Sequence, residues 1–241
     1  MDIKKMNIRK RILIPMVILT IGCGISVLIS SIVLFHNELE RNLQEKINIA
    51  INVLEQTISD FKTNTYIAAF NMTGNPELIS AVRSQDRDEL SKAAERLSVL
   101  ARLEIGTILD KYGNVLLRVH NPDIFGDNAS DLPHIKSALN GEISVYIMEG
   151  PVLALAVAAG APIYDENMNI AGAVTFAIRL DDQAFVNRMQ ALTGCEISIF
   201  NSRGRVATTL SAADSTIIAN IELYRQINET VFAGNTFTTK L

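Results

Sequence analysis

The sequence predicts an α+β protein in which helices come first and an antiparallel sheet follows. Residues 12–35 form an uncharged apolar run, and residues 37–73 repeat apolar side chains every three or four positions. After residue 104, short segments of alternating apolar and polar residues are separated by turn residues, which is typical of strands and hairpins. With 241 residues, 48% of them apolar, the chain can bury the core of one or two domains.

The charge distribution argues against a nucleic-acid-binding protein. The chain has 22 Lys and Arg against 26 Asp and Glu, a net charge of -4. The first 11 residues alone carry a net charge of +4, from Lys4, Lys5, Arg9, Lys10 and Arg11 against Asp2. The remainder is therefore strongly acidic, whereas phosphate contacts need clustered basic side chains.

The apolar run of residues 12–35 is predicted to be a transmembrane helix, because about 20 apolar residues span the hydrocarbon core. Pro15 lies in the first turn, where a missing N–H costs little. The basic cluster before the run should stay in the cytoplasm. The chain is therefore expected in the plasma (inner) membrane, single-pass, with the region after His36 periplasmic or extracellular. The alternative is a cleaved signal peptide, whose apolar region would be roughly 7–15 residues long.

A long amphipathic helix is predicted from residue 37 to about residue 73, and its apolar stripe needs a partner along its whole length. We expect either the same helix of a second subunit, giving a homodimer, or the back of a domain farther along the chain. The stripe consists of Leu39, Leu43, Ile47, Ile51, Leu54, Ile58, Phe61, Thr65 and Ala69. Residues 74–76 break this helix, and two shorter helices are predicted at residues 77–83 and 86–103.

Five strands are predicted next, at residues 105–110, 115–120, 143–148, 152–163 and 170–180, with a short helix at residues 132–139. The economical arrangement is an antiparallel sheet covered on one face by the preceding helices. The pattern then begins again with a helix at residues 181–192 and strands at residues 195–200 and 205–210. A helix at residues 220–228 and a strand within residues 230–241 would follow, so a second module is expected to be truncated at the end of the chain.

An ordered series of motifs resembles the double Cache sensors, the PAS-like extracytoplasmic regions of bacterial and archaeal chemoreceptors and sensor histidine kinases. The motifs are DKYGNVLLRVH (110–120), FGDN (125–128), ALNG (138–141), APIYD (161–165), GAV (172–174), TGCEISIF (193–200) and RVATTL (205–210). The resemblance covers residues 37–241. It implies a cytoplasmic N-terminus (1–11), a membrane helix (12–35), stalk and short helices (36–104), a membrane-distal module (105–180), and a connecting helix with part of a membrane-proximal module (181–241).

Arg118 and His120 are the first candidates for ligand binding. Alternation along the strand predicted at residues 115–120 places them on one face, where they would suit a carboxylate. Citrate-sensing kinases with a single related module are similar around this Arg and His. Their later strand commonly adds a basic residue, whereas residues 152–161 contain none, which disfavours a multiply charged anion. Tyr146 and Arg179 are further candidates, and the expected partner is a small organic ligand such as a carboxylate.

Structural roles compete with each of these assignments. Arg118 could pair with Asp110 or Asp123, His120 could cap a turn, Arg179 could pair with Asp181, and Tyr146 could serve packing alone. Three oxygen-bearing side chains could in principle coordinate a cation, but their spacing fits no calcium loop, so a structural role is preferred. These three are Asp123, Asp127 and Asn128.

No enzyme motif supports catalysis: the sequence lacks the G-x-S-x-G, H-E-x-x-H and G-x-x-x-x-G-K-[ST] patterns, and no metal or cofactor is expected. Cys23 and Cys195 are expected to be free thiols. The predicted function is the ligand-sensing region of a membrane signal-transduction receptor, without its output domain. The alternative is a membrane-anchored structural or dimerisation protein that binds no ligand.

Overall fold

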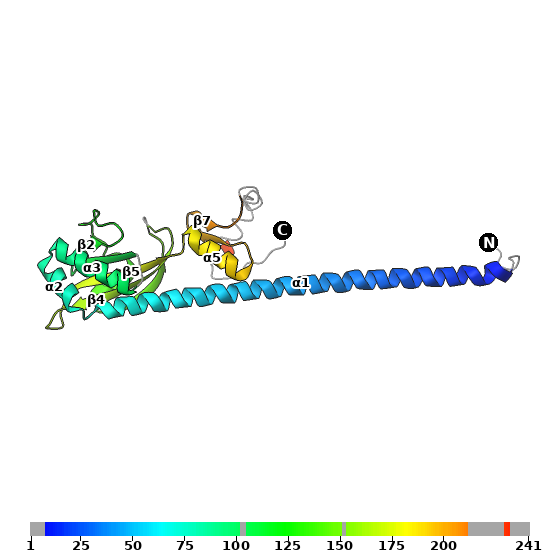
Figure 1. Ribbon diagram of the computed structural model, residues 1–241, viewed down its shortest axis with the longest axis horizontal. Coiled ribbons are helices and arrows are strands. Elements are labelled where there is room, and N and C mark those ends of the chain that lie inside the picture. The colour runs from blue at the N-terminus through cyan, green and yellow to red at the C-terminus, as the bar shows by residue number, and fades with distance from the viewer. Residues whose placement is uncertain (1–7, 102–104, 151–152, 212–228, 232–241) are drawn as a thin grey trace. The chain divides into compact units, whose positions relative to one another are not determined.

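The computed structural model describes residues 8–101, 105–150, 153–211 and 229–231 (Figure 1). The chain divides into two compact units, Met1–Ile51 and Asn52–Leu241. Helix α1, Ile8–Met72, begins in the first unit and ends in the second. The two helices predicted on either side of His36 are therefore one continuous helix.

The described part of the first unit is residues 8–51 of α1, which include the apolar run. Among the described residues, α1 is the one helix long and apolar enough to cross a membrane, with a mean hydropathy of 2.6 over its most apolar 18 residues. The first half of the predicted stripe is exposed here, because Leu39, Leu43, Ile47 and Ile51 keep 40–52% of their surface. Within the described part of the first unit, α1 is alone and nothing covers this part of the stripe.

The second unit opens with three helical segments that form one layer. They are the end of α1, α2 (Pro76–Ser84) and α3 (Arg87–Ala101). Asn75 caps α2 by accepting a hydrogen bond from the Leu78 N–H at 3.0 Å, so the predicted break at residues 74–76 also starts the next helix. Thr65 and Ala69 of α1 are fully buried.

A five-stranded antiparallel sheet follows, in the order β2-β1-β5-β4-β3. Its strands are β1 (Ile105–Asp110), β2 (Val115–Arg118), β3 (Ser144–Met148), β4 (Ala156–Tyr164) and β5 (Ile170–Arg179). One face packs against the helical layer through side chains such as Ile108, Val174 and Phe176. The predicted α+β arrangement is confirmed, although β2 ends at Arg118 and β4 begins only at Ala156.

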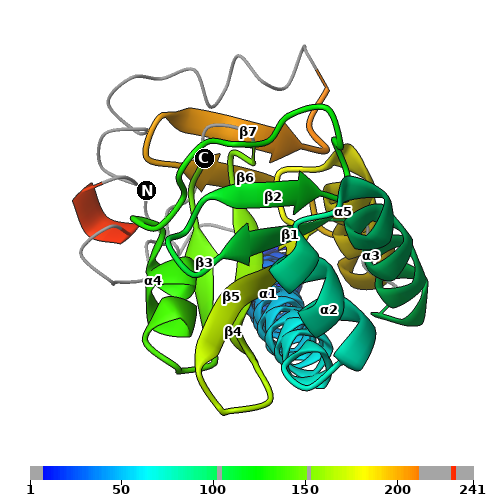
Figure 2. The same cartoon turned by 90° about the vertical axis from the view of Figure 1, so that its left-hand side faces the viewer.

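Helix α4 (Pro133–Leu139) packs on the opposite face of this sheet, at the end marked by Leu109 and Ala173 (Figure 2). Ile135 and Ala138 are the side chains of α4 that enter this second, smaller core. The sheet thus has one face covered by several helices and one face covered by α4 at a single end.

The predicted second pattern begins with α5 (Gln183–Thr193), β6 (Ser198–Asn201) and β7 (Gly204–Thr208). Strands β6 and β7 form a two-stranded hairpin. Phe185, Val186 and Met189 of α5 pack with side chains of the hairpin and with Leu54, Ile58 and Phe61 of α1. This half of the stripe therefore packs on the chain's own domain. The predicted helix at residues 220–228 lies outside the described residues, as does the predicted strand beyond residue 231.

Candidate functional site

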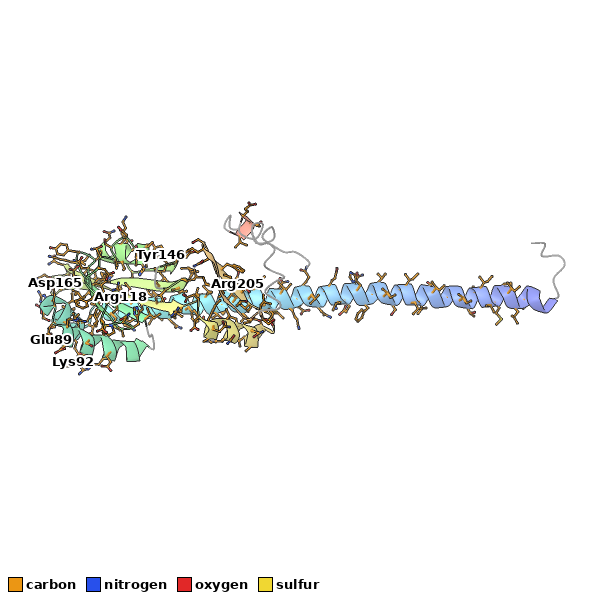
Figure 3. All side chains as sticks on the ribbon, turned by 90° about the horizontal axis from the view of Figure 1, so that it is seen from above. Glu89, Lys92, Arg118, Tyr146, Asp165 and Arg205 are labelled. Carbon is orange, nitrogen blue, oxygen red and sulfur yellow. The ribbon has the colours of Figure 1, made fainter. Side chains whose placement is uncertain are left out.

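The strand register identifies which side chains share the face that bears α4, called here the α4 face. Directly opposed residues of antiparallel strands point to the same side. One row across the sheet is Arg118, Thr107, Thr175, Gly160 and Ser144; the next is Ile105, Ala177, Ala158 and Tyr146; the third is Arg179, Ala156 and Met148. Three of the four candidate ligand residues thus lie on one face, and Arg118 and Tyr146, labelled in Figure 3, come from its two edge strands.

Small residues form the middle of the α4 face. Ala156, Ala158 and Ala177 are 0%, 1% and 8% exposed, and Thr175 is 7% exposed. Ile105, Met148 and Leu153 pack against the three alanines. These small residues are called here the floor; their side chains rise little above the backbone, and the three larger side chains cover the alanines.

One end of this floor lies against α4. Gly160 permits the approach, since a Cβ atom at this position would lie 2.3 Å from the His134 carbonyl oxygen. The His134 side chain is buried, and its Nδ1 has no hydrogen-bond partner among the described residues. The buried hydroxyl of Ser144, which pairs with Gly160 across the sheet, is likewise without one. Burial lowers the pKa of His134 to about 4, so its ring is neutral at pH 7.

Sequence reasoning missed His134 because a single histidine in a short helix carries no motif. Its proximity to Gly160 depends on where α4 settles on the sheet. Tyr146, which was predicted, is 39% exposed, and its hydroxyl lies 3.5 Å from the Ser137 hydroxyl of α4. Tyr146 of the edge strand β3 therefore contacts Ser137 of α4 on the α4 face.

Arg118, at the opposite edge, holds the loop after β2. Its Nη1 and Nη2 donate to the two carboxylate oxygens of Asp127 at 2.8 and 2.7 Å, and Nη1 also donates to the Ile124 carbonyl at 2.8 Å. This bidentate pair lowers the pKa of Asp127. The protein partner is therefore neither Asp110 nor Asp123. Asp110 instead accepts hydrogen bonds from the backbone N–H groups of Tyr112 and Asn114.

His120 follows β2 in a turn and is not part of the strand, so the alternation that placed it beside Arg118 does not apply. The ring nevertheless bonds to the Gly106 backbone, and its pKa is sensitive to both Arg118 and Arg179. Desolvation is the largest influence and lowers this pKa; the two guanidinium charges lower it further, against the Gly106 bond. The structure thus brings Arg118, His120 and Arg179 to one end of the sheet, away from α4.

Arg179 pairs with Asp181, as the structural alternative expected. Its Nε donates to Asp181 Oδ1 at 2.9 Å and its Nη2 to Oδ2 at 3.3 Å. Burial alone would raise the pKa of Asp181, but the bonds from Arg179 and the Ala154 N–H lower it overall. The Arg179 side chain remains 47% exposed, and Nη1 donates to no described group. One of its donor groups therefore stays available at the α4 face.

The preferred structural role fits Asn128, which donates to the Tyr112 carbonyl at 2.9 Å and to the Asn114 side-chain oxygen at 3.0 Å. Among the described residues, no group of three or more His, Cys, Asp or Glu side chains is placed to hold a metal ion.

The described residues also include both cysteines, Cys23 and Cys195, and each is a free thiol.

The connection between β3 and β4 is bonded to the turn between β6 and β7. Glu149 accepts hydrogen bonds from the backbone N–H and the hydroxyl of Ser202, and the Asn201 side chain donates to the Ala154 carbonyl at 3.0 Å. Arg203 also donates to the Gly150 carbonyl. Residues beside the floor are therefore linked directly to the second, two-stranded sheet.

Comparison with solved structures places the fold among bacterial sensor domains. The sensor domain of the Vibrio cholerae histidine kinase DctB matches with a TM-score of 0.54 and 14% identity, over 76% of this chain and 75% of that one, and this likeness supports the fold. The E. coli DcuS sensor domain matches with a TM-score of 0.46 and 23% identity, over 58% and 99%. The ligand-binding domain of the Campylobacter jejuni chemoreceptor Tlp3, solved with L-valine, gives 0.46 and 14%, over 75% and 73%.

No curated protein matches the chain. The family model described as the double sensory domain of two-component sensor kinases matches residues 36–239, which is most of the chain and nearly the whole range over which the resemblance was expected. The chain therefore belongs to this family of double Cache sensory domains.

Proposed function

We propose that this protein is the extracytoplasmic sensory region of a membrane signal-transduction receptor, and that a small organic ligand binds on the α4 face. The observation that supports the site is the floor of small, buried residues between polar and charged side chains at its edges. Ligand sites are mostly apolar with a few convergent polar groups, and this face has that composition. Binding without catalysis is the proposed activity.

We assign the carboxylate-binding end of the site to Arg179 and His120, with Tyr146 on the opposite side of the floor. Arg179 keeps Nη1 available, so it can donate to a carboxylate while it stays paired with Asp181. Arg118 borders the same end and keeps its Nε–H beyond its bonds to Asp127 and Ile124. Because both arginines already face carboxylates, the site adds little net positive charge, which favours a singly charged acid over a citrate-like one.

The proposed domain organisation follows the predicted boundaries: a basic cytoplasmic segment (1–11), a membrane helix (12–35), a stalk (36–104), a ligand-binding module (105–180) and the membrane-proximal module from residue 181. The exposed stripe of Leu39, Leu43, Ile47 and Ile51 supports a parallel homodimer through the stalk. A purely structural, ligand-free dimerisation protein is the alternative that the binding experiment must exclude.

Scanning calorimetry of the full chain in detergent, with and without a panel of mono- and dicarboxylates, tests the proposal. Ligand that binds only the folded state stabilises it by about 2.7 kcal/mol at a hundredfold excess over Kd. At least one monocarboxylate should raise the melting temperature of the wild type. The shift should shrink in Arg179→Gln and persist in Arg205→Gln, which removes an equal charge at an exposed position of β7. No shift with any compound would favour the dimerisation protein.

A further inference from the structure

The α4 end of the floor carries buried polar groups that the protein itself leaves without partners. His134 is 3% exposed, yet its Nδ1 has no hydrogen-bond partner among the described residues. The hydroxyl of Ser144 is also buried and also has no hydrogen-bond partner among the described residues. A buried polar group without a partner is costly, and native proteins keep few of them.

Ser144 and the start of α4 meet at Gly160. Gly160 and Ser144 are opposed in β3 and β4, so they are neighbours in one row across the α4 face, where adjacent strands are about 4.8 Å apart. The close approach of the His134 carbonyl to Gly160 brings the start of α4 next to Ser144.

We infer that His134 and Ser144 form a subsite for an uncharged hydrogen-bonding group of the ligand, a hydroxyl or a carboxamide. This inference rests on the proposed ligand site and names the chemistry at its second end. A hydroxyl or carboxamide both donates and accepts, and so it can satisfy one hydroxyl group and one ring nitrogen together.

Charged groups fit this end poorly. His134 is neutral near pH 7, and the row and its two neighbours on the α4 face hold no acidic side chain that could pair with an ammonium group. The nearest basic residue of the row, Arg118, lies two strands from Thr175 and is bonded to Asp127. A ligand would thus place its carboxylate at the Arg179 end and its neutral polar group beneath α4.

Apo stability and ligand selectivity test this inference together. Ser144→Ala removes a buried hydroxyl group that lacks a partner, so this variant should melt at a higher temperature than the ligand-free wild type. Ser198→Ala is the matched control, because its hydroxyl is bonded to Thr208 at 2.6 Å, and it should melt lower. All proteins are the full chain in the same detergent.

Calorimetric titrations then compare propanoate with 3-hydroxypropanoate and with malonamate, which carry a hydroxyl and a carboxamide. The wild type should bind at least one of the two polar acids roughly tenfold more tightly than propanoate, and Ser144→Ala should lose this advantage while its affinity for propanoate is unchanged. Two results would overturn the subsite alone. One is that the wild type binds all three acids with equal affinity. The other is that Ser144→Ala melts at a lower temperature than the wild type without ligand, as expected if the hydroxyl holds a structural water. If no acid binds the wild type, the proposed carboxylate site fails and the subsite fails with it.

Discussion

His134 shows how a single buried residue can make the stability of the module depend on pH. Its pKa is about 4 in the folded protein because burial disfavours the charged ring, compared with about 6.5 in an unfolded chain. Between these two values the unfolded state binds more protons than the folded state. Stability should therefore rise with pH through this window and fall on acidification.

We predict that the free energy of unfolding of the wild type decreases by about 1.5 kcal/mol from pH 6.5 to pH 5, from this group alone. His134→Gln has no group that titrates there and should lose correspondingly less. The measurement is the melting temperature of both proteins across this range. His120→Gln is the comparison, since His120 is exposed and should change the slope less. Equal slopes for wild type and His134→Gln would refute the assignment.

Arg118 illustrates a residue whose structural and ligand-binding roles can be separated. Its guanidinium is 16% exposed and bidentate with Asp127, whose carboxylate is 52% exposed. Charge-assisted bonds of this kind contribute more than an exposed pair, although the exposure of Asp127 screens part of the interaction.

Arg118→Ala should therefore destabilise the ligand-free protein by about 1–2 kcal/mol, because it frees the loop held through Asp127 and Ile124. The control is Arg83→Ala, which breaks a contact of 3.8 Å between exposed side chains of Arg83 and Glu166 and should cost almost nothing. Both values come from melting curves without ligand. An unchanged melting temperature for Arg118→Ala would instead assign this arginine mainly to ligand binding.

At the scale of elements, the apolar stripe of α1 has two functions that sequence periodicity cannot distinguish. Phe61 packs against Phe185 of α5 with ring centroids 5.8 Å apart, whereas Leu43 is 52% exposed. The same spacing of apolar residues therefore continues from a part of the helix that packs on its own domain into a part that does not.

Phe61→Ala should lower the free energy of unfolding by about 2–3 kcal/mol, somewhat less than for a fully buried phenylalanine. Leu43→Ala is the matched change in the exposed half and should leave the melting of the monomer unchanged. Scanning calorimetry of both variants at low protein concentration measures this difference. If the two variants lost similar amounts of stability, both halves of the stripe would be packed to a similar extent in the monomer, which contradicts this prediction.

The sequence predicted the order and type of the elements well because their signals are local. Apolar periodicity marked α1 and the strands, and turn residues marked the hairpins. The site was less predictable, because its features depend on contacts distant in sequence. The true partner of Arg118 lies in an irregular loop, His120 lies in a turn where alternation no longer applies, and His134 reaches the floor only because Gly160 admits α4.

At the scale of the whole molecule, a signal in a receptor of this family would start at the proposed site and pass to the elements that contact it. A ligand on the α4 face would contact residues next to the β3–β4 connection, and Glu149 ties this connection to Ser202. The chain offers this route in addition to α1, which also reaches the core of α5 and the hairpin. If the proposed site is occupied, these two contacts are the ones through which the second sheet and α1 would be affected.

Membrane orientation is the prediction that every extracytoplasmic assignment needs. The five basic residues of the first 11 should stay in the cytoplasm, so the modules should lie outside. Tyr112 is 68% exposed. The variant Tyr112→Cys, with Cys23 and Cys195 replaced by serine, shows on which side of the membrane the modules lie. In intact cells a membrane-impermeant maleimide should label this cysteine, and prior treatment with a small impermeant thiol reagent should block it. The control is a cysteine at Met6, which should react only after the cells are permeabilised. Labelling of Met6→Cys but not Tyr112→Cys in intact cells would invert the topology and rule out a receptor that senses ligands outside the cell.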